Sequence, residues 1–450
     1  MDVVWVLGGL AANPALTPAA LDRLVAVGGW AVDDELAARA DLTDRHVEQL
    51  ARHGSISALV TLVRRRRVPL AAVEHRPWAI VALLDDHDIP EAWLWRVAAE
   101  RDSELRAELA LAAACPPDLL RLLAQDPDLV SSVAASAALT PALAEEFARH
   151  PDVVVRRAVA ANRDAPASVL ADLAADIGDR TEAAYELQLA VAGNPAAPVA
   201  PVTALVGHPS RLVRLALAER SDLDPDSYRA LARDVEVRRE LAANPAVGEP
   251  LIRELATNDL RRWISRNPAL PLDVLADLAA GIRIGPAPLP RIASATQVEI
   301  RRFAAGPLRA LLAQHPDLPA DVAATMPDDP DPRVARAVAS NPLVTADQLR
   351  RMTARHGGAV AAGVVRNPNC PRDLLDDLLG TEAGRRLLRA VAAHPNAAPA
   401  TVAALLDHDD HLVASSAAAN PALPAEAAER ILAVVSECDQ AGKSGSSICS

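Results

Sequence analysis

A chain of 450 residues exceeds what one globular core usually holds, so it must form several domains or an extended repeat array. Hydrophobic residues make up 51% of it but aromatic residues only 2%, which excludes a disordered chain and favours thin layers of Ala, Leu and Val helices. A net charge of −13 argues against nucleic acid as the default partner.

The cysteines and the apolar runs bear on the compartment. Cys115, Cys370, Cys438 and Cys449 lack the close spacing of a metal knuckle or a redox pair, which predicts free thiols in a reducing compartment. The apolar run 3–10 follows an acidic residue and is short, so we interpret it as a first helix rather than a signal peptide. No uncharged run approaches the roughly 20 residues of a membrane helix. We therefore expect a cytoplasmic protein without membrane association.

A repeated anchor position organises the chain. Asn-Pro or His-Pro recurs at His315, Asn341, Asn367, His394 and Asn420, with intervals of 26, 26, 27 and 26 residues. Earlier and weaker copies complete about seventeen repeats of 24 to 27 residues. These earlier anchors are Asn13, Arg39, Arg65, Asp86, Ala112, Ser136, Asn162, Asn194, Arg220, Asn244 and Asn267.

Each repeat predicts two short helices. In the copy at 153–176, the first helix covers Val153 to Ala161, with Val155, Ala158 and Val159 facing inward. The anchor Asn ends this helix, and its amide can satisfy loose backbone groups. The second helix is expected to start with proline at its first position and to continue with a Leu stripe. Examples of these prolines are Pro166, Pro271, Pro319, Pro371 and Pro424.

Three segments depart from the regular repeat period. The interval from Asn162 to Asn194 is 32 residues, with the excess near 177–182. The segment 281–308 is rich in Gly and Pro and predicts an irregular seam. Residues 436–450 are polar and Gly/Ser-rich, which predicts a disordered tail after a continuous solenoid covering 1–435.

The joint occurrence of this period, Asn-Pro and the following Pro-x-Asp start resembles the leucine-rich repeat variant family. The segments 155–162 and 367–375 carry the resemblance most clearly. It implies a right-handed superhelix, so the expected fold is an all-α, right-handed α-solenoid. A member of that family also carries an iron–sulfur cluster near its N-terminus. No cysteine precedes Cys115 here, so we expect no cofactor and no metal.

An arginine recurs six residues before several anchors, and stacking should place these arginines in a row. Such a row could bind carboxylate or phosphate groups bidentately. The alternative is a structural ladder in which each arginine pairs with a turn aspartate such as Asp152, Asp234 or Asp259. The arginines proposed for binding are Arg156, Arg214, Arg238, Arg261 and Arg309.

Other conspicuous residues have structural interpretations. The His/Asp clusters at 85–88 and 408–411 fall in expected turns rather than in a metal-ligand pattern. Cys115 and Cys370 precede a helix-starting proline, where a helix dipole could lower a thiol pKa, although a small apolar filler is the simpler interpretation.

The sequence therefore predicts a non-enzymatic scaffold that binds an unknown protein or peptide. Binding of nucleic acid or another polyanion through the arginine row is the alternative. A third hypothesis is an enzyme built around the 281–308 segment, which the fold class alone does not decide.

Overall fold

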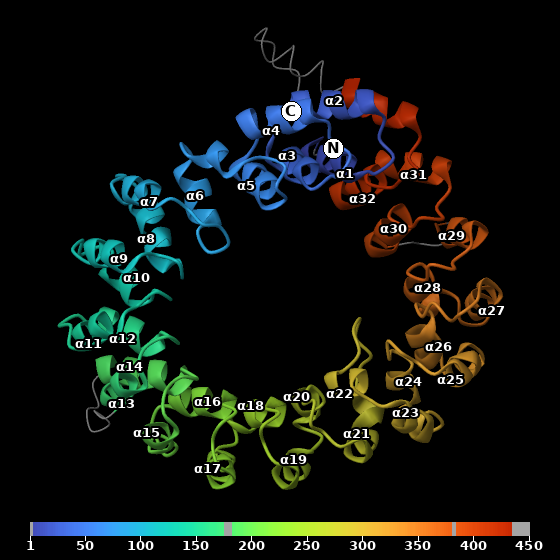
Figure 1. Ribbon diagram of the computed structural model, residues 1–450. Coiled ribbons are helices and arrows are strands. Elements are labelled where there is room, and N and C mark those ends of the chain that lie inside the picture. Colours follow the sequence, from blue (N-terminus) through green and yellow to red (C-terminus); the bar gives the residue numbers. More distant parts are fainter. Residues whose placement is uncertain (1–2, 175–181, 380–383, 434–450) are drawn as a thin grey trace. The chain divides into compact units, whose positions relative to one another are not determined.

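The computed structural model describes residues 3–174, 182–379 and 384–433, and every regular element in these ranges is a helix (Figure 1). The protein is all-α, as the sequence predicted. No helix in the described ranges is long and apolar enough to cross a membrane. The predicted excess at 177–182 falls largely, and the predicted tail at 436–450 entirely, outside the described residues.

The chain divides into two compact units. Unit 1 comprises Met1–His75, Pro286–Pro288 and Thr296–Ser450, and unit 2 comprises Arg76–Gly285 and Leu289–Ala295. One division falls within the predicted seam at 281–308. The other, between His75 and Arg76, has no counterpart in the sequence prediction. Both ends of the chain therefore belong to the same unit.

Unit 2 contains two rows of helices, one formed by the first helix of each repeat and one by the second. The first-helix row is α6 (Pro77–Leu83), α8 (Ser103–Leu111), α10 (Val130–Ala134), α12 (Val153–Ala161), α14 (Glu182–Gly193), α16 (Arg211–Glu219), α18 (Arg238–Ala243) and α20 (Arg261–Ile264). The second-helix row is α7 (Glu91–Ala98), α9 (Pro117–Leu123), α11 (Pro141–Ala148), α13 (Ala167–Ala174), α15 (Val199–Thr203), α17 (Pro225–Leu231), α19 (Glu249–Leu255) and α21 (Leu272–Leu278), followed by η2 (Ala279–Gly281) and α22 (Pro290–Ala293).

Unit 1 has the same two rows, but its first-helix row runs through both chain ends. In order of contact, this row is α24 (Arg309–Leu312), α26 (Pro332–Val338), α28 (Gly358–Val364), α30 (Arg385–Ala392), α32 (His411–Ala418), α1 (Val3–Ala12), α3 (Trp30–Ala37) and α5 (Ile56–Arg64). Its other helices include α23 (Gln297–Phe303), α25 (Ala320–Thr325), η3 (Met326–Asp328), α27 (Ala346–His356), α29 (Arg372–Leu379), α31 (Pro399–Leu406), α2 (Pro18–Val27), α4 (Asp44–His53), η1 (Leu70–Val73) and a last helix over 425–433.

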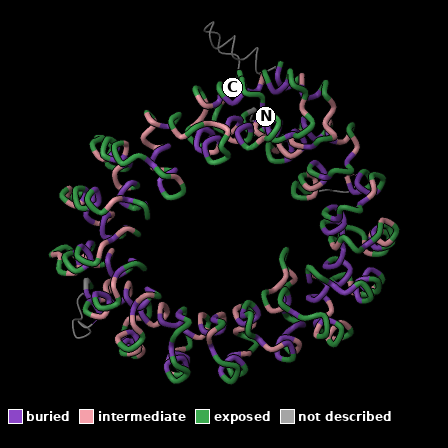
Figure 2. The backbone as a smooth tube through the Cα atoms, in the orientation of Figure 1, coloured by how far each residue is buried: buried purple, intermediate pink, exposed green. Residues whose placement is uncertain are grey.

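Within each unit, the core lies between the two rows and between successive repeats, where the buried residues gather (Figure 2). The predicted Leu stripes are part of this core, since Leu275, Leu374 and Leu375 are at most 5% exposed. A helix pair of this length cannot bury both faces alone, so each repeat depends on its neighbours.

Local predictions were close, with two corrections. Helix α12 covers Val153–Ala161 with Val155 and Val159 buried, as predicted, but the third inward residue is Ala160 rather than Ala158, which is half-buried. All five prolines expected at the first helical position precede the helix instead, and Pro271 and Pro319 occupy the N-cap. An extended N-cap suits proline because it needs no backbone N–H.

The anchor residues connect each repeat to the preceding one. The Nδ2 of Asn162 donates to the carbonyl oxygens of Ala134 (3.0 Å) and Ser136 (2.8 Å), both in the preceding repeat. Its Oδ1 accepts from the backbone N–H of Asp164 at 2.8 Å. The carbonyl of Ala134 lies at the end of α10, where no helical N–H follows, whereas the carbonyl of Ser136 also accepts from the backbone N–H of Leu139 at 3.2 Å. The amide therefore satisfies the first carbonyl and gives the second an additional donor. The same pattern recurs at Asn13, Asn194, Asn244, Asn267, Asn367 and Asn420.

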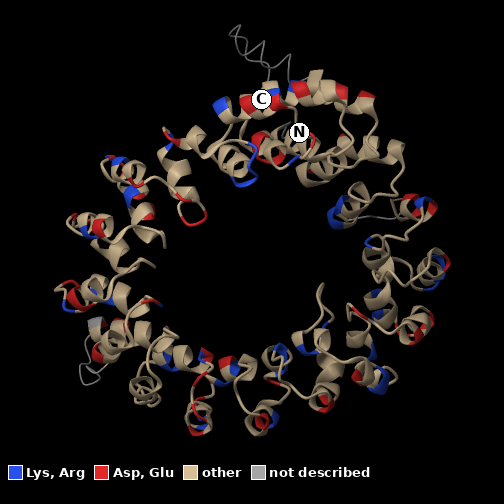
Figure 3. Cartoon of the chain, in the orientation of Figure 1, with Lys and Arg blue, Asp and Glu red and all other residues tan. Residues whose placement is uncertain are grey.

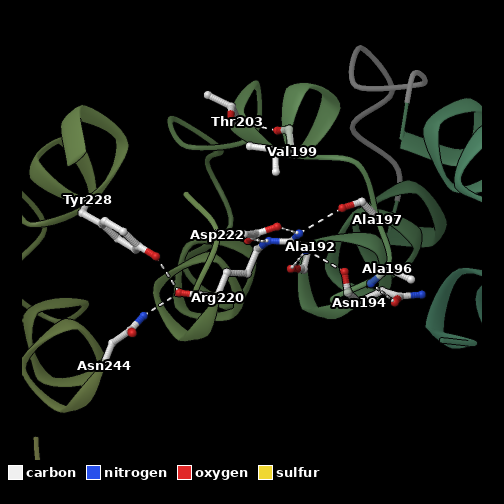
Figure 4. Close-up of polar contacts among 10 residues, drawn as sticks. All are labelled: Ala192, Asn194, Ala196, Ala197, Val199, Thr203, Arg220, Asp222, Tyr228 and Asn244. Atoms are coloured by element: carbon white, nitrogen blue, oxygen red, sulfur yellow. Dashed lines mark hydrogen bonds and ion pairs between the residues drawn. The ribbon is translucent and has the colours of Figure 1, made fainter. Parts of the chain in front are cut away.

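Arginine replaces asparagine at some anchors and makes the same connection. The buried guanidinium of Arg220 donates to the carbonyls of Ala192 (3.3 Å) and Asn194 (2.6 Å) in the preceding repeat (Figure 4). It also pairs with Asp222 at 2.6 Å, which neutralises the buried charge. The backbone carbonyl of Arg220 then accepts from the amide of Asn244 at 2.6 Å. We call the series of hydrogen bonds from anchor side chains to carbonyls of the preceding repeat the ladder. It continues where arginine replaces asparagine.

The ladder also runs across the two chain ends. The Nδ2 of Asn13 donates to the carbonyls of Ala418 (2.9 Å) and Asn420 (2.8 Å), as if the N-terminal repeat followed the C-terminal one. Helix α1 packs directly on α32, and a Cβ at Gly9 would lie 2.2 Å from the carbonyl oxygen of Ser415. We call this contact between α1 and α32 the joint.

The ladder is interrupted after the seam. His315 is the first anchor there, and its Nδ1 accepts from the backbone N–H of Asp317 at 3.0 Å, as an anchor oxygen would. Its Nε2 is buried and has no partner among the described residues. By contrast, the Nε2 of His394 is 3.0 Å from the carbonyl oxygen of Asn367, so a histidine anchor can make the connection elsewhere in unit 1.

We predict that Gly9→Ala opens the joint, because the added Cβ cannot fit against the backbone of Ser415. The expected loss is about 2–3 kcal/mol of unfolding free energy, measured by urea denaturation, with faster proteolysis of α1. Gly193→Ala is the matched control, since its nearest neighbour is 4.0 Å away, and should be neutral or stabilising by up to about 1 kcal/mol. Equal effects of the two substitutions would contradict a tight joint.

Candidate binding surface

The arginine row proposed from the sequence lies on the first-helix rows. Arg156, Arg214, Arg238 and Arg261 belong to α12, α16, α18 and α20 of unit 2, whereas Arg309 belongs to α24 of unit 1. Successive helices α16, α18 and α20 are in contact, so the last three of the unit 2 arginines occupy neighbouring repeats. All five side chains are half-buried rather than exposed.

Contacts within the protein occupy these guanidinium groups. The Nη1 of Arg156 donates to the carbonyls of His150 (2.6 Å) and Pro151 (2.8 Å). Arg214 donates to the equivalent carbonyls of its own repeat and also pairs with Asp234 at 2.7 Å. Such arginines close the turn that precedes the first helix, where carbonyls would otherwise lack donors.

The other three arginines of the row also contact groups within the protein, but with different partners. The Nε of Arg238 donates to the carbonyl of Ala232 at 2.6 Å, and Arg261 donates to Asn258 at 3.2 Å. The Nε of Arg309 pairs with Asp329 at 3.1 Å. These contacts favour the structural alternative for the row, although of the suggested aspartates only Asp234 pairs with a member of it.

Arg309 also lines a cleft of about 540 Å³ within unit 1, together with Asp321, Asp328 and Asp329. This cleft bears on the hypothesis of an enzyme near 281–308. Its aspartates pair respectively with Arg301 (3.0 Å), Arg351 (3.4 Å) and Arg309 (3.1 Å). The Arg301 guanidinium holds the pKa of Asp321 below its ordinary value. The cleft therefore has the character of a structural ion-pair network.

The two described cysteines are apolar fillers. Cys115 and Cys370 are 3% and 0% exposed, and burial raises their thiol pKa values to about 11 and about 12. The possibility that a helix dipole lowers these pKa values is therefore wrong. In the His408 to His411 segment, His408 and Asp410 cap the turn and helix α32, and the described residues contain no His/Cys/Asp/Glu cluster able to hold a metal.

A different surface gathers exposed apolar side chains at the joint. Trp5 and Trp30 are 41% and 61% exposed, and their rings meet edge to face with centroids 5.8 Å apart. The ring of Trp5 also lies 5.8 Å from that of His411 on α32. We define the apolar stripe as Val4, Trp5, Trp30, Ile56, His411 and Leu412.

The stripe follows from the repeat register. His411 and Leu412 lie nine and eight residues before the anchor Asn420, and Val4 and Trp5 lie at the same distances before Asn13. Trp30 and Ile56 lie nine residues before the next two anchors. Equivalent positions on successive first helices form a line, here across α32, α1, α3 and α5, which contact one another in that order.

Unit 2 also exposes apolar side chains at these two repeat positions, including Val235 (69%), but charged residues such as Arg211 interrupt them. Val154 and Leu212 are 42% and 59% exposed at the same repeat position, but Glu186 on the intervening α14 separates them. Glu236 occupies the equivalent position in the next repeat, just before α18 begins at Arg238. Scattered apolar residues are ordinary on a protein surface, whereas a contiguous patch suggests an interaction site.

The line of first helices becomes positively charged just beyond the α32 end of the stripe. Helices α1 and α32 carry no charged residue in the described ranges, whereas α30, the next helix in the row, begins with Arg385 and Arg386 (Figure 3). These two arginines lie nine and eight residues before the anchor His394, so they continue the same line. The side chain of Arg385 is 82% exposed and approaches Asp410 at 3.6 Å.

Sequence reasoning missed this surface. Trp5 and Trp30 are two of only six tryptophans, and their distance from an anchor was available as a signal. The contact of Trp5 with His411 was not, because it joins residues from opposite ends of the chain.

The chain matches no protein-family model and no curated protein sequence. The candidate surface therefore rests on its own geometry.

We predict that Arg214→Ala destabilises the protein by about 1–2 kcal/mol, because two carbonyls and Asp234 lose their donor. The Arg214 guanidinium lowers the pKa of Asp234, so its contribution is present above the ordinary Asp pKa and lost as pH falls through the lowered one. Urea midpoints at about pH 6 and about pH 3 should show the difference from wild type shrinking in acid.

Arg229→Ala is the control for this prediction, since Arg229 is 58% exposed and pairs with a 90% exposed Asp226. A change in oligonucleotide affinity on Arg214→Ala, without a change in stability, would instead support the arginine row as a binding site.

Proposed function

We propose that this protein is a non-enzymatic scaffold of the leucine-rich repeat variant type, which binds another protein or a peptide along the apolar stripe. The observation that supports the proposal most directly is the contiguity of the stripe over four successive helices, with Trp5 and Trp30 at its centre. Tryptophan is a frequent anchor of protein interfaces because it buries a large area at a small cost in side-chain entropy.

The construction of the joint adds to this argument. Gly9, Asn13 and the backbone of Ser415 hold α1 closely against α32, so Trp5 and His411 are presented on fixed helices. Binding residues on rigid elements lose less conformational freedom when a partner is bound. Exposed tryptophans on such a frame favour recognition over core packing.

We also propose a cytoplasmic location. Cys115 and Cys370 are separate, buried and unpaired, as is usual where thiols stay reduced.

Peptide selection tests the proposed function. A random peptide library displayed on phage would be selected on the intact protein and counter-selected on the Trp5→Ala, Trp30→Ala double variant. We expect enriched peptides that bind the protein at least about tenfold more tightly than the double variant, as measured by fluorescence anisotropy. Trp95→Ala is the matched control, because Trp95 is 39% exposed but belongs to the second-helix row.

Enriched peptides should bind the Trp95→Ala variant as they bind the unmodified protein. If selection enriches no peptide that distinguishes the double variant from the intact protein, the apolar stripe is not a peptide-binding surface and the proposal is wrong.

A further inference from the structure

We infer that the partner segment of the apolar stripe is acidic at one end and apolar at the other, and that its acidic end binds Arg385 and Arg386. This inference rests on the proposed function and specifies the chemistry of the partner. It follows from the position of the two arginines, which are the next members of the line that contains His411 and Leu412.

The arginines are available to a ligand. Arg385 is 82% exposed, and among the described residues its ion-pair partner is Asp410 at 3.6 Å, which itself caps the start of α32. Arg386 and Arg389 are exposed and have no ion-pair partner among the described residues. Several arginines of the other first helices pair with backbone carbonyls or carboxylates, as Arg106, Arg156 and Arg214 do.

Acidic side chains on the neighbouring helices could compete with a partner for these arginines. Asp410 is only 15% exposed and accepts from the backbone N–H of Leu412 at 3.0 Å, so it is committed to the helix start. Asp34 on α3 is half-buried and accepts from Ser55 at 2.6 Å. Asp409 and Glu35 are exposed and would repel a polyanion that covered the whole stripe. The cationic character is therefore confined to the α30 end.

The geometry fits a short linear segment. Neighbouring packed helices lie about 8–10 Å apart, so the four intervals from α30 to α5 cover about 32–40 Å. An extended chain covers this length with about 10–12 residues, at about 3.3 Å per residue. Carboxylates at one end would meet the guanidinium groups, which favour bidentate pairing, and apolar side chains would cover Trp5 and Trp30.

The test uses three fluorescein-labelled probes on the intact protein. The first is the dodecapeptide Glu-Glu-Asp-Glu-Gly-Leu-Ser-Phe-Ser-Leu-Gly-Ile, the second replaces its four acids with Lys, and the third is an oligothymidylate of about twelve nucleotides. Anisotropy titrations at about 50 mM and about 300 mM NaCl would give affinity and salt dependence.

We expect the acidic peptide to bind at least about tenfold more tightly than the Lys peptide at low salt. The Arg385→Glu, Arg386→Glu variant should reverse that preference, and it should fold, because glutamate is favourable in the first turn of a helix. Arg121→Glu is the control, since Arg121 is 60% exposed on α9 of unit 2, and should leave both affinities unchanged.

The possible failures are distinguishable. Equal binding of both peptides, lost on Trp5→Ala and Trp30→Ala, would leave the proposed function standing and overturn the acidic partner. The same holds if the phage selection enriches neutral or basic peptides. Binding of neither peptide also overturns the acidic partner. Preferential binding of the oligothymidylate through the tryptophans would overturn both proposals in favour of a single-stranded nucleic acid.

Discussion

The structure depends on how the carbonyls at the end of each first helix find hydrogen-bond donors. These carbonyls are buried between repeats, where an unsatisfied acceptor costs about 1–3 kcal/mol. An asparagine amide of the next repeat supplies two N–H groups to two of them, as Asn267 does to Ala242 and Asn244. Arg220 shows that the constraint concerns donors rather than residue type, because its guanidinium donates to the equivalent carbonyls of its preceding repeat, those of Ala192 and Asn194. Each repeat that carries such an anchor is thus fixed in register on the preceding one.

The same constraint accounts for the candidate site. At the joint, Asn13 serves Ala418 and Asn420 of the C-terminal repeat, so α1 takes the register of the helix after α32. This register places Trp5 beside His411 and opposite Trp30. The apolar stripe is a consequence of a structural ladder that continues across the chain ends. Its composition differs from that of unit 2, where acidic residues at the same repeat position separate the apolar ones.

Much of the fold could be predicted from the sequence. The anchor spacing and the Leu stripes are local signals, and they located α12 and the all-α class correctly. The role of the Asn amide in satisfying backbone groups was also predicted, but not that its partners lie one repeat away. The joint could not be predicted, because no local pattern shows that Gly9 faces Ser415, some 400 positions later. Likewise, Arg156 is half-buried because its guanidinium donates to the carbonyl of His150 in the preceding turn. The spacing of residues in the sequence does not show the direction of that carbonyl.

Amide hydrogen exchange of the Asn13→Ala variant, followed by mass spectrometry, tests the central claim most directly. If the anchor amide holds the C-terminal repeat to the N-terminal one, exchange should accelerate both in α1 and in α32, while helices α12 and α16 of unit 2 keep their protection. Faster exchange confined to α1, with α32 unchanged, would contradict the account, since the joint would then not depend on the anchor and the stripe would lack its structural basis.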